Sequence, residues 1–238
     1  MPRLIAAILR HGEYQQLADT PSAHQPFPLT ESGFRQARAA AAPLLETCDA
    51  RGWHLHPVID SSNLLRGWQT ARDLADTLAE LSGQRFEVEG HDALAERGLG
   101  SAANLSVARI EDIVEADPRF PPLPANWKSD SHFRLPLQGA ESLIDAGARV
   151  AAHMRRRMEE MAARVDRDTV RLFVGHGAAF RHAAYHLGAM ALDDVGRFSM
   201  YHARPIYLLA GDAGTPWRQV AGEWKLRSSS ADRSVLPD

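Results

Sequence analysis

The stretch Leu4-Ile-Ala-Ala-Ile-Leu9, followed by Arg10-His11-Gly12-Glu13, decides how this chain folds. Six apolar residues in a row are typical of a short strand that is buried on both faces, and Gly12 marks its end. A second run, Val170 to Val174, ends in the same way at Gly175-His176-Gly177. Strands buried on both faces belong to parallel sheets that helices cover. The two runs therefore indicate an α/β fold.

Helical segments alternate with these strands along the chain. Thr30 is typical of a helix N-cap, and the Ala-, Arg- and Gln-rich residues after it predict a helix over 31–47. Helical spacing of apolar residues predicts further helices over 64–81, 141–164 and 178–187. Short strands are expected at 57–60, 86–88, 206–209 and 220–224. This order predicts a three-layer α/β/α sandwich around a mostly parallel sheet.

Residues 98–140 break the regular pattern because they contain five prolines and only one short predicted helix, over 106–116. A loop-rich insertion of this length inside a compact domain is typical of a lid or binding region. We therefore expect one domain over residues 1–227, with 98–140 as a lid that selects the substrate. A polar tail, residues 228–238, is expected to lack regular structure.

The composition is that of an ordinary soluble domain: 238 residues, 45% apolar, 24% charged and a formal net charge of −3. This balance does not indicate a nucleic-acid or membrane-surface binder, and no apolar run is long enough to span a membrane. A single cysteine excludes a disulfide framework and a cysteine-based zinc site, and fits the reducing cytoplasm. No metal or cofactor is expected, and the oligomeric state stays open.

Two histidines and two arginines follow three of the predicted strands, in the stretches Arg10-His11-Gly12, Ser61-Ser62 with Arg66 in the next turn, and Gly175-His176-Gly177-Ala178. The carboxyl ends of parallel strands meet at one edge of a sheet, so these side chains are expected to lie together. Guanidinium groups and the backbone N–H groups that open a helix, here at Gly177 and Ala178, suit a dianionic tetrahedral group. The sequence therefore predicts a phosphate site.

These stretches also carry a family resemblance. The motifs, in chain order, are Arg10-His11-Gly12-Glu13, Leu29-Thr30-x-x-Gly33-x-x-Gln36-Ala37, Ser61-Ser62-x-Leu64-x-Arg66-x-x-Gln69-Thr70-Ala71 and Gly175-His176-Gly177 with Arg181. Together they resemble the histidine phosphatase superfamily, the phosphoglycerate mutase-like family, from residue 4 to about 188. The resemblance implies that His11 attacks phosphorus and forms a phosphohistidine, which water hydrolyses. Arg10, Arg66 and a cationic His176 are then expected to hold the phosphate oxygens.

An alkoxide leaving group also needs a proton, which calls for a carboxylic acid in the site. Glu96 is our first candidate, because the family places its acid after the third strand. Glu13, which adjoins the nucleophile, is the second candidate, and Glu141 is a weaker third. Glu96 could instead be a surface carboxylate that pairs with Arg97.

Departures from the family pattern bear on the activity. The stretches where phosphoglycerate mutases bind their sugar acid read Tyr14-Gln-Gln-Leu-Ala and Gly98-Leu-Gly-Ser-Ala-Ala-Asn-Leu here, and neither matches. We therefore favour a metal-independent phosphatase acting on a phosphorylated small molecule or a phosphoprotein. Arg10-His-x-x-Tyr14 is similar to the branch that dephosphorylates proteins. Mutase-type phosphotransfer and a catalytically weak phosphate- or protein-binding module remain the alternatives.

The remaining conspicuous side chains are interpreted structurally. Nine further histidines are expected to be surface or core residues: His24, His54, His56, His91, His132, His153, His182, His186 and His202. Arg181 is expected to pair with a neighbouring loop, and Trp53, Trp68 and Trp224 to lie in the core. Within the predicted lid, the aromatic and basic residues of 127–134 either contact the organic part of the substrate or form an exposed loop.

Overall fold

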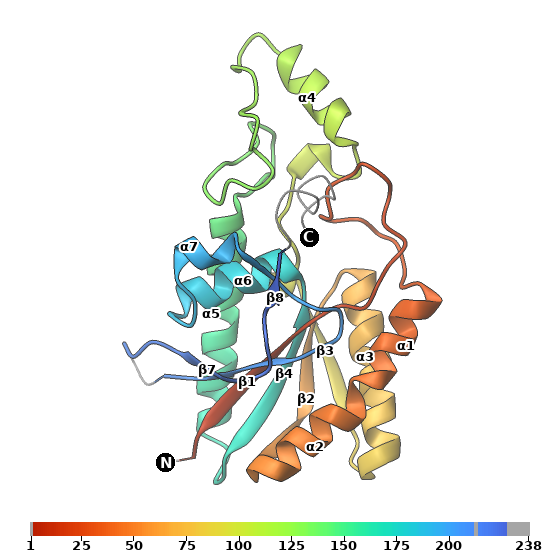
Figure 1. Cartoon of the computed structure of the whole chain (residues 1–238), viewed down its shortest axis with the longest axis vertical. Coiled ribbons are helices and arrows are strands. Elements are labelled where there is room, and N and C mark those ends of the chain that lie inside the picture. The colour runs from red at the N-terminus through yellow and green to blue at the C-terminus, as the bar shows by residue number, and fades with distance from the viewer. Residues whose placement is uncertain (1, 212–213, 228–238) are drawn as a thin grey trace.

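A six-stranded sheet in the order β3-β2-β4-β1-β6-β7 forms the centre of the computed structural model, which describes residues 2–211 and 214–227 (Figure 1). Its strands are β1 (Leu4–Arg10), β2 (His54–Ser62), β3 (Glu87–His91), β4 (Thr169–Gly175), β6 (Ile206–Leu209) and β7 (Arg218–Ala221). The first four run parallel, whereas β6 and β7 add an antiparallel edge. The prediction of a mostly parallel sheet is confirmed.

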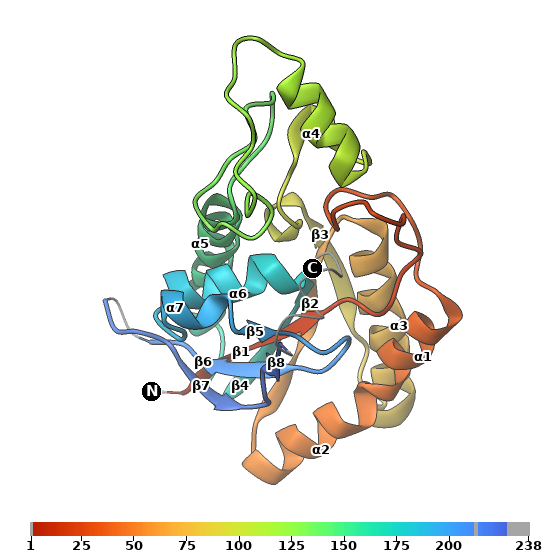
Figure 2. The ribbon, with the colours of Figure 1, turned by 45° about the horizontal axis from the view of Figure 1, so that its top comes forward.

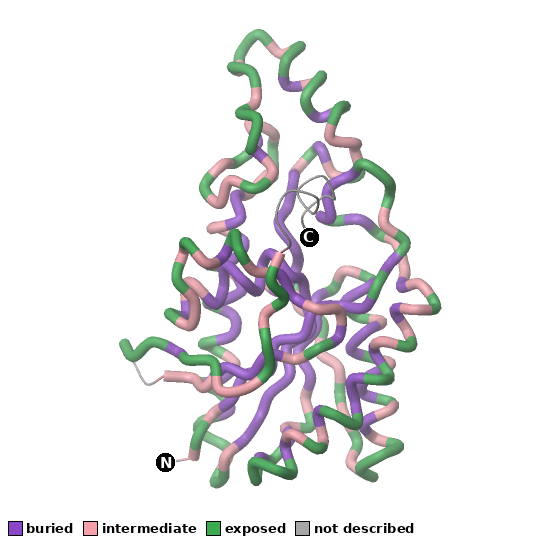
Figure 3. Tube along the Cα trace, viewed as in Figure 1, coloured by how far each residue is buried: buried purple, intermediate pink, exposed green. Residues whose placement is uncertain are grey.

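Helices cover both faces of this sheet (Figure 2). The helices of the described residues are α1 (Glu31–Ala39), α2 (Ala41–Arg51), α3 (Leu65–Ser82), α4 (Val107–Glu115), α5 (Leu143–Ala162), α6 (Gly177–His186) and α7 (Leu192–Val195), of which α4 lies away from the sheet (Figure 1). Successive side chains of β1 lie on opposite faces of the sheet. Ile5 and Leu9 pack in one core with α2 and α3, whereas Ala6 and Ile8 pack in another core with α5 and α6. The central strands β1 and β4 are buried along almost their whole length, as the sandwich prediction requires (Figure 3).

The expected helix over 31–47 is in fact two helices that meet at Ala40. Thr30 does cap the first, because its Oγ1 accepts the Gly33 N–H at 3.0 Å. Pro43 explains the break: it has no N–H to bond the carbonyl of Ala39, so a continuous helix would lose a bond there, whereas the first turn of a new helix tolerates it. Cys48, expected beyond a helix end, lies buried inside α2.

Strand β2 is longer than the sequence indicated: it begins at His54, whereas we expected it to begin at Pro57. Its register against β4 shifts between Leu55 and Ile59, the kind of irregularity at which a strand accepts proline. Strand β7 begins at Arg218, two residues before its expected start. The sequence did not predict α7, β5 (Phe198–Ser199) or β8 (Lys225–Leu226), which are too short to show a period.

Residues 98–140 project above the sheet and carry α4 (Figure 1). They form a small core of their own, in which Trp127 is 1% exposed and Leu99, Ile110 and Leu135 are also buried. Ala23, from the loop that follows β1, belongs to the same core. The backbone N–H of Val107 also donates to the carbonyl of Asp19 in that loop. The insertion is therefore packed against the loop that begins at the end of β1.

The prediction that three tryptophans lie in the core was confirmed only in part. Trp53 is buried and Trp224 half-buried, but Trp68 is 44% exposed because it lies one residue off the buried stripe of α3. The expected tail, 228–238, lies outside the described residues. Among the described residues, no helix combines the length and apolar character needed to cross a membrane.

Candidate active site

The strand register brings the predicted side chains to one edge of the sheet. Arg10 pairs with Gly175 across β1 and β4, and Ser61 pairs with Val174 across β2 and β4. His11 and His176, each one residue beyond its strand, therefore lie side by side, with ring centroids 5.0 Å apart. Both rings are buried.

His11 is held in one tautomer. Its Nδ1 lies 2.7 Å from the carbonyl oxygen of Gly12, which can only accept a hydrogen bond, so Nδ1 carries the proton. Its Nε2 accepts a hydrogen bond from Nε of Arg66 at 3.2 Å. Burial lowers the pKa of His11 well below its usual value, and the charge of Arg66 lowers it further. The ring is therefore neutral, and the lone pair on Nε2 faces the site.

Arg66 lies in the first turn of α3 and is fully buried. Two main-chain carbonyls hold its guanidinium: Nη1 donates to Gln25 at 3.0 Å and Nη2 to Ala23 at 2.7 Å. Its face stacks on the ring of Tyr14, 4.5 Å from the ring centroid. Because Ala23 also belongs to the small core of residues 98–140, the packing of that segment helps to fix Arg66 beside His11.

His176 precedes α6, and its Nε2 lies 2.9 Å from Oγ of Ser62. Its Nδ1 is buried and has no hydrogen-bond partner among the described residues. Burial first, and then the charge of Arg66, lower the pKa of His176 well below its usual value. Arg10 is also buried, and its Nη1 donates to the carbonyl of Met200 at 3.0 Å. The site thus presents two buried imidazoles and two buried guanidiniums at one edge of the sheet.

Glu96 is 2% exposed and lies against the first turn of α6. Its carboxylate accepts the backbone N–H groups of Ala178 at 3.3 Å and Ala179 at 3.2 Å, shortly after His176 in the chain. It also accepts the backbone N–H of Arg97 at 2.9 Å. Glu96 is therefore not a surface carboxylate, and the Ala178 amide expected to bind phosphate donates to it. Gly177 opens α6 beside them.

The two alternative acids lie elsewhere. Glu13 is exposed, and its carboxylate accepts a hydrogen bond from Thr30 at 3.3 Å. Glu141 forms an ion pair of 2.6 Å with Arg149 and accepts the Gly98 N–H at 2.9 Å. Of the three carboxyl groups, only Glu96 is buried beside the turn that carries His176.

Two histidines that the sequence analysis assigned to the surface or core belong to this site. Nδ1 of His202 lies 2.8 Å from the main-chain oxygen of His11, and the two ring centroids are 5.8 Å apart. Nε2 of His24 lies 2.9 Å from the main-chain oxygen of Glu96. No local pattern could reveal either, because 191 residues separate His202 from His11.

The structural interpretation of Arg181 is confirmed, since it donates to the carbonyls of Val195 and Phe198.

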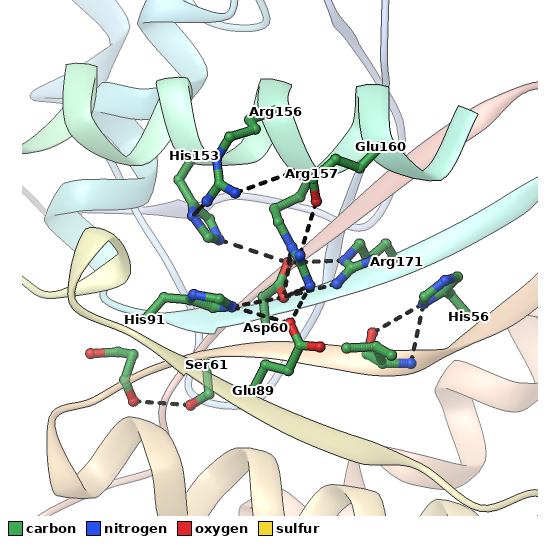
Figure 4. A network of polar contacts seen from close by, with 12 residues as sticks. His56, Asp60, Ser61, Glu89, His91, His153, Arg156, Arg157, Glu160 and Arg171 are labelled. Carbon is green, nitrogen blue, oxygen red and sulfur yellow. Dashed lines mark hydrogen bonds and ion pairs between the residues drawn. The ribbon is translucent and has the colours of Figure 1, made fainter. Parts of the chain in front are cut away.

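A second polar network lies one residue before Ser61 on β2 (Figure 4). Asp60 is fully buried and accepts two hydrogen bonds of 2.9 Å from Arg171, while Arg157 and His91 contact it at 3.0 and 3.1 Å. Burial alone would raise the pKa of Asp60, but interactions with His153, His91 and Arg171 outweigh it and hold the pKa well below its usual range. This network joins β2, β3, β4 and α5 below the candidate active site.

The same network contains the one group among the described residues with metal-ligand spacing, Asp60, His91 and His153, whose ligand atoms lie within 4.8 Å of one another. Two guanidinium groups already bind both oxygens of Asp60. A metal cation there would face both positive charges, so the donor set fits an ion-pair network better than a metal centre. The side chains of the candidate active site itself are imidazoles and guanidiniums.

Comparisons with known proteins agree with this geometry. A model of the histidine phosphatase superfamily (branch 1) matches residues 6–220. A mycobacterial glucosyl-3-phosphoglycerate phosphatase in complex with inorganic phosphate is 25% identical, with a TM-score of 0.60 over 94% of this chain and 97% of its own. The alpha-ribazole phosphatase from Shigella flexneri shares the fold at 18% identity, with a TM-score of 0.65 over 95% and 100% of the two chains. A search of curated protein sequences finds no match.

Proposed function

Because the chain belongs to branch 1 of the histidine phosphatase superfamily, we propose that it is a metal-independent phosphatase that hydrolyses a phosphate monoester through a phosphohistidine on His11. One observation carries the proposal. Nε2 of the buried His11 is unprotonated, because Nδ1 binds the Gly12 carbonyl and Arg66 donates to Nε2. A neutral imidazole with its lone pair beside a guanidinium is a nucleophile placed next to an anion-binding group.

In the first step, Nε2 of His11 attacks phosphorus as the bond to the leaving oxygen breaks. Arg10 and Arg66 offset the charge on the phosphate oxygens, and Nδ1 of His176, which has no other partner among the described residues, donates to one of them. Glu96 gives its proton to the leaving alkoxide. An approaching dianion opposes the effects that lower the pKa of His176, so the ring takes up a proton as the substrate binds.

In the second step, Glu96 accepts a proton from water while the water oxygen attacks phosphorus. The phosphorus–nitrogen bond breaks, neutral His11 is regenerated, and inorganic phosphate leaves. The amides of Ala178 and Ala179 fix the position of the Glu96 carboxyl group at the start of α6, so the same group can give a proton in the first step and take one from water in the second.

The organic part of the substrate is proposed to lie in a cavity of about 430 Å³ next to this site, bordered by His24, Asn63, Leu64, Asp92, Ala95, Glu141 and Arg149. Ala95 adjoins Glu96, and Asn63 adjoins Ser62. Most of the lining side chains can form hydrogen bonds, which suits a small polar molecule. The phosphatase relatives named above, which are named for small phosphorylated compounds, support the same class of substrate.

The domain organisation is part of the proposal: one domain over 1–227 with 98–140 as the lid over the substrate. The lid core reaches Ala23, whose carbonyl binds Arg66, and this contact supports a role in substrate binding. We also infer a cytoplasmic location, which the free, buried Cys48 supports.

Hydrolysis of p-nitrophenyl phosphate tests the activity. The wild type should turn over and His11→Ala should not, whereas His54→Ala, a matched change at an exposed histidine, should leave the rate unchanged. Rapid quenching in base should trap an acid-labile phosphoenzyme in the wild type alone. Activity should also survive EDTA; loss on chelation would contradict the mechanism.

A panel of small phosphate esters and phosphopeptides then identifies the substrate class. The proposal expects higher kcat/KM for small polar esters. A transfer assay between phosphoglycerate isomers tests the mutase alternative. Tight binding of inorganic phosphate without turnover of any panel member would indicate a binding module instead.

A further inference from the structure

We propose that a second cavity, at the opposite end of β1 from His11, is a binding site for a small organic carboxylate. The cavity measures about 310 Å³, and its lining includes Arg51 at the end of α2 and residues of β6 and β7. Ile5 near the start of β1 lines it, whereas His11 follows the other end of that strand. Six residues of extended strand separate the two sites by about 20 Å.

The charge of this cavity is positive. Arg3, Arg51 and Arg218 line it, and none of the lining residues is acidic. Arg3 forms an ion pair with Asp168. Among the described residues, neither Arg51 nor Arg218 forms an ion pair with a carboxylate. Two guanidinium charges therefore remain without a compensating group, and guanidinium is the side chain that best matches a planar oxyanion.

Trp53 also lines this cavity and carries a hydrogen-bond donor. The residue is 7% exposed, and its indole Nε1 is buried without a hydrogen-bond partner among the described residues. A buried donor that lacks an acceptor destabilises the folded state. The guanidinium of Arg51 stacks over the indole ring, 5.0 Å from its centroid, so the charge and the donor are held together.

The other residues that line the cavity indicate the chemistry of the part of the ligand that carries the carboxylate. Ile5, Leu209 and Val220 contribute apolar surface, and Gln219 adds a neutral polar group. The volume lies at the lower end of the range of about 300–1,000 Å³ for ligand pockets. An oxyanion on a compact apolar body, such as an aromatic carboxylate, fits both the charge and the apolar surface. This inference does not depend on the proposed phosphatase activity.

Benzoate is the probe for the test, and benzamide is its neutral control. Isothermal titration calorimetry should detect benzoate binding to the wild type, at least tenfold weaker binding to the double variant Arg51→Gln/Arg218→Gln, and no comparable binding of benzamide. Trp53→Phe keeps the ring but removes the donor, so it should weaken benzoate binding a few-fold. The matched variant Arg35→Gln/Arg72→Gln, with two exposed arginines in α1 and α3, should bind as the wild type does.

Three results would overturn the inference: no benzoate binding at 10 mM (about −2.7 kcal/mol at that Kd), equal binding of benzamide, or loss of binding in His11→Ala, which would place the ligand in the other site. The thermal midpoint of each variant shows whether it is folded. A binding defect with an unchanged thermal midpoint is attributable to the cavity.

Discussion

Nε of Arg66 donates to Nε2 of His11 across 3.2 Å, so a buried cation and a buried neutral imidazole face each other at the candidate active site. A protonated His11 could not accept this bond and would meet a like charge. The contact therefore favours the neutral imidazole, which is the protonation state that the proposed nucleophilic attack requires.

The first prediction concerns the titration of His11. Burial and Arg66 both lower its pKa, so the ring should remain neutral on acidification from pH 7 to 6, where a solvent-exposed histidine gains charge. Arg66→Gln removes a positive charge, and the pKa should rise as a result. Nitrogen-15 NMR of the imidazole, assigned with His11→Gln, measures both midpoints. An unchanged or lower midpoint in Arg66→Gln would show that the guanidinium does not control this group.

The second prediction concerns the proton donor. Glu96→Gln should reduce kcat by about 10²–10⁴-fold for an alkyl phosphate, whose leaving oxygen needs a proton. The reduction should be smaller for p-nitrophenyl phosphate, which leaves as a stable phenolate. Glu13→Gln is the matched control, since the Glu13 side chain is exposed and accepts a hydrogen bond from Thr30. A larger loss of kcat in Glu13→Gln than in Glu96→Gln would indicate that Glu13 is the proton donor.

The third prediction concerns His202 as a positioning residue. Its Nδ1 binds the main-chain oxygen of His11, and the backbone N–H of Ala203 donates to the carbonyl of Arg10, so this segment holds the end of β1. His202→Ala should lower kcat about tenfold, as expected for one lost hydrogen bond, with little change in KM. His202→Asn keeps a donor and should recover part of the rate. Equal losses in the two variants would argue against positioning through this bond.

The fourth prediction concerns stability. Asp60→Asn removes the charge that compensates Arg171 and Arg157, so the free energy of unfolding should fall by about 3–5 kcal/mol. Asp166→Asn is the control, because Asp166 is 84% exposed in its ion pair with Arg167 and should change stability by less than about 1 kcal/mol. Urea denaturation measures both. Similar losses in the two variants would mean that burial of the network is not what matters.

Much of the fold could be predicted because short-range patterns encode it. The apolar run of β1, the Thr30 cap and the strand that ends at Gly175 are local features, and each is present in the structure. The predictions that were wrong also concern local features of the sequence. Pro43 divides a helix that appeared continuous, and Trp68 lies off the buried stripe of α3 although its spacing looks helical. Burial of a single helix position depends on the partner that it meets.

The sequence by itself determined the order of strands and helices and the candidates His11, Arg66 and His176, because residues at strand ends are fixed by the chain's own periodicity and glycines. Only the tertiary structure decided the contacts between distant residues. His202 lies 191 residues from the His11 carbonyl, and Asp60 lies 111 residues from Arg171. Hydrogen bonds act over about 3 Å in space, whatever the separation along the chain. Such partners become visible only when the sheet and its helices have brought them together.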